Sequence, residues 1–517
     1  MKYSHKILTT AFILIVAVVS FFLIGDTVLS GIIRKKLEKG PVASIRITSK
    51  SVEASLWRGR IVLGEVELTD TSGLGQASIP KVEFGGFKLW RLLIHREIVL
   101  KSVEVLRPTI EMTMTNDSVS VDEDSAGEFS QAFRIRQVKF VDARINLLQK
   151  GAEKTDTIFL TRLDLDFWDL ATSTPQEKYS YESLSFNRLR LVLQQGQYLL
   201  PGGLYAVDYD TLDFDSEKRL LKGAQINLRS RDGKYEIGRN RGVETDWFDI
   251  AVTRISFSEI RLDALLNDTA VVLSKAQIAG LNVKSFRDKR LPFPVKPDTK
   301  LLRGMLNNLP VALHVDSVLV NDGTISYAER VKDSTDEGEV VFSQVQGQLF
   351  CLSSIDRLIG RKTTMHVEAR AMERGLLTAD FVFPNKRFPN NYQVSGTLGE
   401  MDIEAFNPML VQNASVRVET GNLKRLAFNF TYDDDRSAGD LLFEYDNLKV
   451  HILDKEDRTN KKVQSFFTNI LVLQKENIRD DRSFREGTIA FERDKKKSLF
   501  NYWWKSLLSG IKSIAIL

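Results

Sequence analysis

Apolar and polar residues alternate with a period of two along most of this chain from residue 44 onward. The clearest stretch is 425–432 (RLAFNFTY), in which every second residue is large and apolar. Successive side chains of a β-strand point to opposite faces of a sheet, so this period predicts strands with one apolar face. The same alternation appears at Leu163/Leu165/Phe167, Leu189/Leu191/Leu193, Tyr205/Val207/Tyr209, Met365/Val367/Ala369 and Ala379/Phe381/Phe383. We therefore expect a mainly β fold.

The region from 425 to 452 predicts a meander of three antiparallel strands. Residues 433–439 (DDDRSAG) supply a first turn, and Asp446-Asn447 supplies a second, because these residue types favour turns. The apolar face of this meander comprises Leu426, Phe428, Phe430, Tyr432, Leu441, Phe443, Tyr445, Leu448, Val450 and Ile452. The few helices expected in the body are short, at 299–308, 353–360 and 402–411.

Three segments resemble one another: 98–112 (IVLKSVEVLRPTIEM), 135–147 (IRQVKFVDARINL) and 315–327 (VDSVLVNDGTISY). Each has an apolar strand, a short break that carries Pro, Ala or Gly, and a second strand with an isoleucine. Such recurrence favours an elongated, curled antiparallel β-sheet in which each unit packs only on its neighbours.

The apolar face of such a sheet has two interpretations. It is either the inside of closed β-sandwiches, or an open trough whose apolar side chains solvate acyl chains. Both arrangements produce the same period of two, so alternation alone does not distinguish them.

The start of the chain carries an uncharged apolar run at 7–24 (ILTTAFILIVAVVSFFLI), preceded by Lys2 and Lys6. A helix needs about 20 apolar residues to cross a bilayer, and this run is close to that length. The alternative is a cleaved signal peptide, since Val28-Leu29-Ser30 before Gly31 would serve as a cleavage site. We expect a single-pass transmembrane anchor with most of the chain outside the cytoplasm.

The composition, with 43% hydrophobic and 27% charged residues, is that of a folded protein. The formal net charge of only +4 argues against a general nucleic-acid binder. Cys351 is the only cysteine, which excludes an intramolecular disulfide. The five histidines are scattered without metal-ligand spacing, and the sequence contains neither a nucleophile elbow nor a phosphate-binding loop. We therefore expect no enzymatic activity, no catalytic residues, no metal site and no cofactor.

The last segment, 493–517, predicts an amphipathic helix with a broad apolar stripe after a basic start at Arg493. Lys505 and Lys512 interrupt the apolar run, which disfavours a helix that spans a membrane. One interpretation is a helix at a membrane interface, and the other is a helix that plugs the end of the sheet or docks on a partner. The expected membrane-interface residues are Lys495, Lys496, Lys497, Trp503 and Trp504.

Four stretches resemble the AsmA-like family of Gram-negative envelope proteins, to which TamB-type proteins also belong. They are 42–68 (VASIRITSKSVEASLWRGRIVLGEVEL), 89–112 (LWRLLIHREIVLKSVEVLRPTIEM), 396–453 and 484–512 (FREGTIAFERDKKKSLFNYWWKSLLSGIK). The resemblance implies a groove-forming β-sheet of the repeating type found in bridge-like lipid-transfer proteins. It also implies an inner-membrane anchor, a periplasmic body and a role in moving phospholipid towards the outer membrane.

These observations predict five parts. They are a transmembrane anchor (1–25), an N-terminal AsmA-like module (26–130), a repeated β-groove body (131–395), a C-terminal AsmA-like β-region (396–492) and the amphipathic helix (493–517).

The expected function is that of an inner-membrane-anchored periplasmic protein that binds or conducts phospholipid along an apolar β-groove and supports outer-membrane lipid homeostasis. The ten apolar residues of the meander are the expected groove lining. The expected partners are phospholipid, the inner membrane and an outer-membrane or periplasmic protein. The alternative is an envelope scaffold that influences outer-membrane biogenesis and carries no lipid.

Overall fold

The fold is known from a computed structural model. It describes residues 45–55, 59–70, 74–87, 91, 97–115, 133–150, 155–172, 179–181, 184–332, 334–389, 391–453, 474–479 and 482–515. The expected anchor at 7–24 and the basic segment that follows it lie outside these residues. Among the helices that the structure does describe, none has the length and apolar character needed to cross a membrane.

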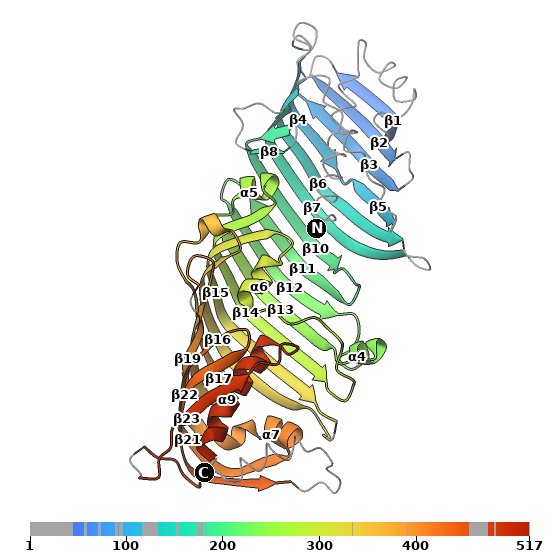
Figure 1. The fold of residues 1–517 in the computed structure, drawn as a ribbon. Helices are drawn as coiled ribbons and strands as arrows, with labels where there is room; N and C mark the ends of the chain where they lie inside the picture. Colours follow the sequence, from blue (N-terminus) through green and yellow to red (C-terminus); the bar gives the residue numbers. More distant parts are fainter. Residues whose placement is uncertain are drawn as a thin grey trace. The chain divides into compact units, whose positions relative to one another are not determined.

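The described chain is mainly β, with a long curled sheet and few helices, as the alternation predicted (Figure 1). It divides into two compact units, one of residues 1–226 with 257–272 and the other of residues 227–256 with 273–517. Strands β12 (Leu220–Ser230), β13 (Asp246–Ser258) and β14 (Ala270–Asp288) carry residues of both units. The module boundaries expected from the sequence stay predictions.

The described part of the first unit is a sheet that is accompanied by the short helix α5 (Leu262–Asn267). Its strands are β1 (Ile45–Ser55), β2 (Arg60–Asp70), β3 (Gly75–Gly85), β4 (Ile98–Leu106), β5 (Thr109–Thr115), β6 (Phe133–Lys150), β7 (Thr155–Thr172), β8 (Tyr179–Tyr181), β9 (Leu184–Phe186), β10 (Arg188–Leu199) and β11 (Tyr205–Asp215). Neighbours pair antiparallel from β1 to β3, and again from β6 through β7 and β10 to β11.

The expectation of a wholly antiparallel sheet is wrong at one place, because β6 pairs parallel with both β4 and β5. This pairing sets two of the similar segments side by side in matching register, with Leu100 opposite Ile135 and Ile110 opposite Ile145. In a parallel pair, equivalent positions face the same side of the sheet, so two similar sequences place apolar residues beside apolar residues.

The second unit contains strands β15 (Ala312–Arg330), β16 (Gly338–Ser353), β17 (Thr363–Ala371), β18 (Gly375–Phe383), β19 (Tyr392–Leu398), β20 (Met401–Asp402), β21 (Val416–Tyr432), β22 (Arg436–Ile452) and β23 (Gly487–Glu492). All their recorded pairings are antiparallel, in the order β15, β16, β17, β18, β19, β21, β22, β23. The helical segments are α4 (Glu236–Arg241), α6 (Leu302–Asn307), η2 (Asp356–Leu358), η3 (Ile403–Phe406), α7 (Asn407–Ala414) and α9 (Leu499–Ala515). Those at α6, η2 and η3–α7 confirm the three short helices expected in the body.

The breaks of the three similar segments share one backbone feature. Arg107, Asp142 and Asp322 have φ of 48°, 49° and 55°, and each directly precedes the Pro, Ala or Gly of its break. The pairing register shifts at the last two breaks, which makes them β-bulges. Because a bulge adds one residue, the apolar positions shift phase by one and stay on the same face of the sheet, while the strand bends.

A bulge of the same kind corrects the predicted three-strand meander. The turn at 433–435 joins β21 to β22 as expected, but Asp446-Asn447 is not a turn. Asn447 adopts φ 51° inside β22, and the strand continues to Ile452. Asparagine tolerates this left-handed conformation better than most residues, so one long strand replaces the two that were expected.

Candidate functional site

Strand pairing in the second unit gathers apolar side chains into rows that cross the strands. The first row contains Val318, Leu349, Met365, Phe381, Val394 and Phe430. The second contains Val320, Gly347, Val367, Ala379, Gly396 and Phe428. We call the face that carries these rows the inner face.

The opposite, outer face of the same strands is polar. Directly between the two apolar rows runs a row of Gln348, His366, Asp380, Ser395, Asn429 and Asp440. Because successive residues point to opposite sides of a sheet, this polar row belongs to the outer face. The second unit therefore has one apolar and one polar face over five neighbouring strands, β16, β17, β18, β19 and β21.

Helix α9 covers one end of the inner face (Figure 1). Tyr502 is buried at 2% exposure, and the ring of Trp503 lies 4.8 Å from that of Phe381. Gly510 allows a close approach, since a Cβ atom there would lie 2.9 Å from the Leu441 Cβ atom. Of the two interpretations of this segment, the placement favours a helix that covers the end of the sheet.

Serines on α9 bind the last strands, and sequence reasoning missed them. Two backbone N–H groups of β23 donate to serine hydroxyls, Thr488 to Ser513 at 2.7 Å and Ala490 to Ser509 at 3.2 Å. The Ser506 hydroxyl lies 2.7 Å from that of Ser437 on β22. The signal was present in the sequence, because serines at 506, 509 and 513 share one helical face.

The sheet of the second unit curls around α9. Phe500 of α9 contacts Tyr327 of β15, with ring centroids 6.0 Å apart, while the same helix packs on β22 and β23. Six pairing steps separate β15 from β22, which would be about 29 Å in a flat sheet. Phe500 and Ser506, which contacts Ser437 of β22, are only about 9 Å apart along the axis of α9, so both contacts require the sheet to bend around the helix.

The structure places nearly all of the predicted groove residues beneath or beside α9. Those that are buried are Phe428, Phe430, Tyr432, Leu441, Phe443, Tyr445 and Leu448. Leu426 and Val450 are half-buried, and Ile452 is exposed. Most of these side chains form one hydrophobic cluster with Tyr502 and Ile514 of α9, so protein covers this end of the inner face.

The inner face continues onto β15, β16 and β17, where its larger apolar side chains are only partly buried: Val318, Val320, Leu349, Met365 and Val367. Met365 and Val367 still pack against the cluster, and Ala369 and Ala371 of β17 are buried, so the most open part of the face lies on β15 and β16. The sequence showed the alternation of these strands, but only the pairing register reveals that they extend the rows of Phe381 and Phe428. An uncovered set of aligned apolar side chains is typical of a surface that binds apolar ligands.

Of the expected membrane-interface residues, the three lysines lie just before α9 and the two tryptophans lie in its first turns. Lys495 pairs with Asp435 at 2.6 Å and Lys496 with Asp298 at 2.8 Å. The Lys497 ammonium lies 3.5 Å from the centre of the Phe293 ring, and burial lowers its pKa. Trp503 is half-buried in the cluster, whereas Trp504 is 44% exposed.

Charged groups also lie near α9. Lys289 of the β14–β15 connection pairs with Glu329, and Arg287 pairs with Asp246. Burial lowers the pKa of Lys505 of α9, and the neighbouring ammonium of Lys512 lowers it further. Charged side chains of both signs therefore lie beside α9, next to the apolar rows.

Within the described parts of the chain, no three His, Cys, Asp or Glu side chains lie close enough together to hold a metal ion. No protein-family model matches the sequence. A search of curated proteins finds no significant match. The resemblance to the AsmA-like family therefore remains an expectation, drawn from the segments quoted above.

Proposed function

We propose that this protein binds lipid by shielding acyl chains on the inner face of its β-sheet, without bond chemistry. The observation that supports the proposal is the contrast between the two faces of the same strands. From β16 onward the outer row is polar, whereas the inner rows are apolar and stay only partly buried on β15–β17.

The energetics of such binding need no further machinery. Each methylene removed from water stabilises a bound chain by about 0.8 kcal/mol, so a few half-exposed side chains suffice to hold a chain weakly. Weak binding suits a protein that exchanges lipid with a membrane. The proposal includes the expected setting, an inner-membrane anchor with a periplasmic body that supports outer-membrane lipid homeostasis.

The test replaces apolar groups where the face is open rather than where α9 covers it. Val318 and Leu349 are cross-strand neighbours outside the cluster that contains Tyr502 and Ile514, so Val318→Gln with Leu349→Gln places two amides side by side in the first row. The matched control is Leu376→Gln, because Leu376 is 50% exposed and pairs with Arg370 rather than with a residue of the inner rows.

Full-length protein is purified in detergent, and bound phospholipid is quantified by native mass spectrometry. We expect the double variant to lose at least about tenfold in bound phospholipid, since about 1.5–3 kcal/mol of apolar contact is removed per side chain. The control should retain the wild-type amount. Equal phospholipid in wild type and a folded double variant would sink the proposal and leave the envelope scaffold as the better interpretation.

A further inference from the structure

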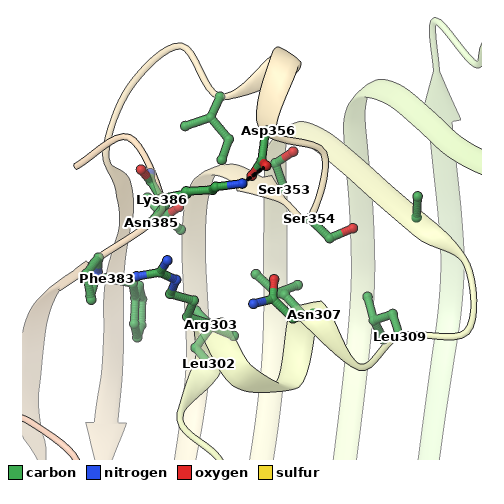
Figure 2. A pocket seen from close by; sticks show the side chains of 15 residues that line it. Leu302, Arg303, Asn307, Leu309, Ser353, Ser354, Asp356, Phe383, Asn385 and Lys386 are labelled. Atoms are coloured by element: carbon green, nitrogen blue, oxygen red, sulfur yellow. Dashed lines mark hydrogen bonds and ion pairs between the residues drawn. The ribbon is translucent and has the colours of Figure 1, made fainter. Parts of the chain in front are cut away.

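A cavity of about 490 Å³ lies at one end of strands β16, β17 and β18 in the second unit, beneath α6 (Figure 2). This volume is within the range of small-molecule sites. Its lining is amphipathic. Leu302, Leu306, Ile359 and Phe383 are apolar, whereas Arg303, Asn307, Ser354 and Lys386 carry polar groups.

Several of the polar groups already have partners inside the protein. Ser354 accepts a hydrogen bond from the Leu313 N–H at 2.9 Å. The Asn385 side chain accepts from the Phe388 N–H at 3.0 Å and donates to the Arg361 carbonyl at 2.9 Å. Lys386 forms an ion pair with Asp356. These side chains hold the walls of the cavity in place.

Arg303 is different. Among the described residues, its guanidinium has neither a hydrogen-bond nor an ion-pair partner, although its backbone N–H donates to the Tyr392 hydroxyl at 3.4 Å. Figure 2 shows its side chain extending from α6 towards Asn385 and Lys386. Asn307 follows one helical turn later on the same side of α6. A guanidinium has five donors in a planar fork that matches a phosphate group.

The apolar wall of the cavity joins the inner face. Phe383 lines the cavity, and its ring is parallel to that of Phe381, with centroids 6.0 Å apart. Phe381 belongs to the first apolar row, next to Met365 and Leu349. Thr363 also lines the cavity and lies two residues before Met365 on the same face of β17. An amphiphile whose polar group lies beside Arg303 can therefore extend its chains past Thr363 towards the partly buried residues of the first row.

We propose that this cavity binds the phosphate head group of a phospholipid, with Arg303 as the principal ligand and the Asn307 amide beside it. The inference rests on the proposed function, because it assigns the head-group end of the same lipid site. The charge of the lining fits a phosphate, because the lining contains two cationic side chains, Arg303 and Lys386, and only one carboxylate, that of Asp356.

The test measures binding of dihexanoyl phosphatidylglycerol below its micelle concentration, by calorimetry on the full chain. Dihexanoyl glycerol, which lacks the phosphate, and inorganic phosphate, which lacks the chains, are the comparison ligands. Wild type should bind the phospholipid at least about tenfold more tightly than either, because a hydrogen bond to a charged group is worth this factor or more.

Arg303→Gln should abolish the preference for the phospholipid over dihexanoyl glycerol, and Arg303→Lys should restore part of it. Arg374→Gln is the matched control, because Arg374 is exposed at the opposite end of the β17–β18 hairpin, and it should bind as wild type does.

The following results would overturn the inference. They are an unchanged preference in Arg303→Gln, an equal loss in Arg374→Gln, or inorganic phosphate binding as tightly as the phospholipid. The head-group site alone fails if wild type binds both amphiphiles equally and Arg303→Gln changes nothing. If wild type binds neither amphiphile, the proposed lipid function fails with it.

Discussion

Arg493 shows how one residue ties distant parts of the second unit together. Its side chain is 1% exposed, pairs with Asp434 at 2.7 Å and donates to the Thr299 carbonyl oxygen. The guanidinium also lies 5.6 Å from the centre of the Tyr502 ring. It therefore joins the β21–β22 turn, the segment before α6 and the first turn of α9.

Replacing Arg493 should destabilise this junction. Arg493→Met removes charge-assisted hydrogen bonds in a buried setting, so we expect the free energy of unfolding to fall by about 2–3 kcal/mol. The matched control is Lys495→Met, whose pair with Asp435 is exposed on both sides and whose loss should leave the free energy of unfolding close to that of wild type. Urea unfolding followed by tryptophan fluorescence measures both. Similar losses in the two variants would contradict the role of Arg493 as a junction.

His366 predicts a pH dependence of stability. Its ring lies 2.7 Å from an Asp380 carboxylate oxygen and 3.4 Å from one of Glu368, and these carboxylates raise its pKa above 6.5. A raised folded-state pKa means that the charged form is stabilised by folding. The contribution is complete below pH about 6.5 and is lost as the pH rises through the folded-state pKa.

The effect should be small, below about 1 kcal/mol, because the His366 side chain is 40% exposed. Wild type should lose stability relative to His366→Gln as the pH is raised from about 6 to 8. Urea midpoints of both proteins across this range provide the measurement. Asp380→Asn should reduce the difference, and parallel pH profiles in wild type and His366→Gln would refute the assignment.

At the level of the strand, the bulges explain what sequence patterns could and could not predict. The change of apolar phase between Tyr445 and Leu448 is visible in the sequence, but a turn and a bulge produce the same change. Only the backbone conformation distinguishes a turn from a bulge. Asn447 has a left-handed conformation while the strand continues past it, so this position is a bulge.

Asn447 thus becomes testable as a bulge residue. Asn447→Gly should leave the free energy of unfolding unchanged within about 0.5 kcal/mol, because glycine adopts a positive φ freely. Asn447→Val should cost about 1–2 kcal/mol, since a β-branched residue resists that conformation. Asn429→Val, at an exposed and regular position of β21, should be neutral. Urea unfolding measures the stability of the three variants. If Asn447→Val is as stable as wild type, residue 447 does not require a left-handed conformation and the bulge assignment is wrong.

The pairing between strands distant in the sequence could not be predicted from the sequence. The likeness of 98–112 and 135–147 was visible, yet nothing local specifies that the two strands run parallel. The same limit applies to the site. The alternation predicted an apolar face, but the residues chosen to line it, such as Phe430 and Tyr445, lie in the α9-associated cluster. The half-exposed Leu349 and Val320 were identified only from register.

At the scale of the whole molecule, two large clusters of buried apolar side chains are found among the described residues, one within each unit. The first gathers residues of β1–β9, including Ile79 and Ile135, and the second gathers residues of β17–β23 with α9. Apolar residues on β15 and β16 are mostly half-exposed by comparison. In a sheet whose strands contact only their neighbours, stability is a sum of local terms. Damage to one cluster should therefore stay local.

Ile135→Ala tests this locality. Ile135 is 0% exposed, so the truncation should cost about 2–5 kcal/mol within the first cluster. Hydrogen exchange should accelerate in β4–β7, while the amides of β21–β23 keep their wild-type protection, because the second cluster shares no residue with the first. Arg493→Met provides the reciprocal experiment. Hydrogen exchange should accelerate near α9, while the amides of β4–β7 keep their wild-type protection. Loss of protection throughout the chain in either variant would mean that the two clusters unfold as one cooperative core, which a sheet with half-exposed central strands should not do.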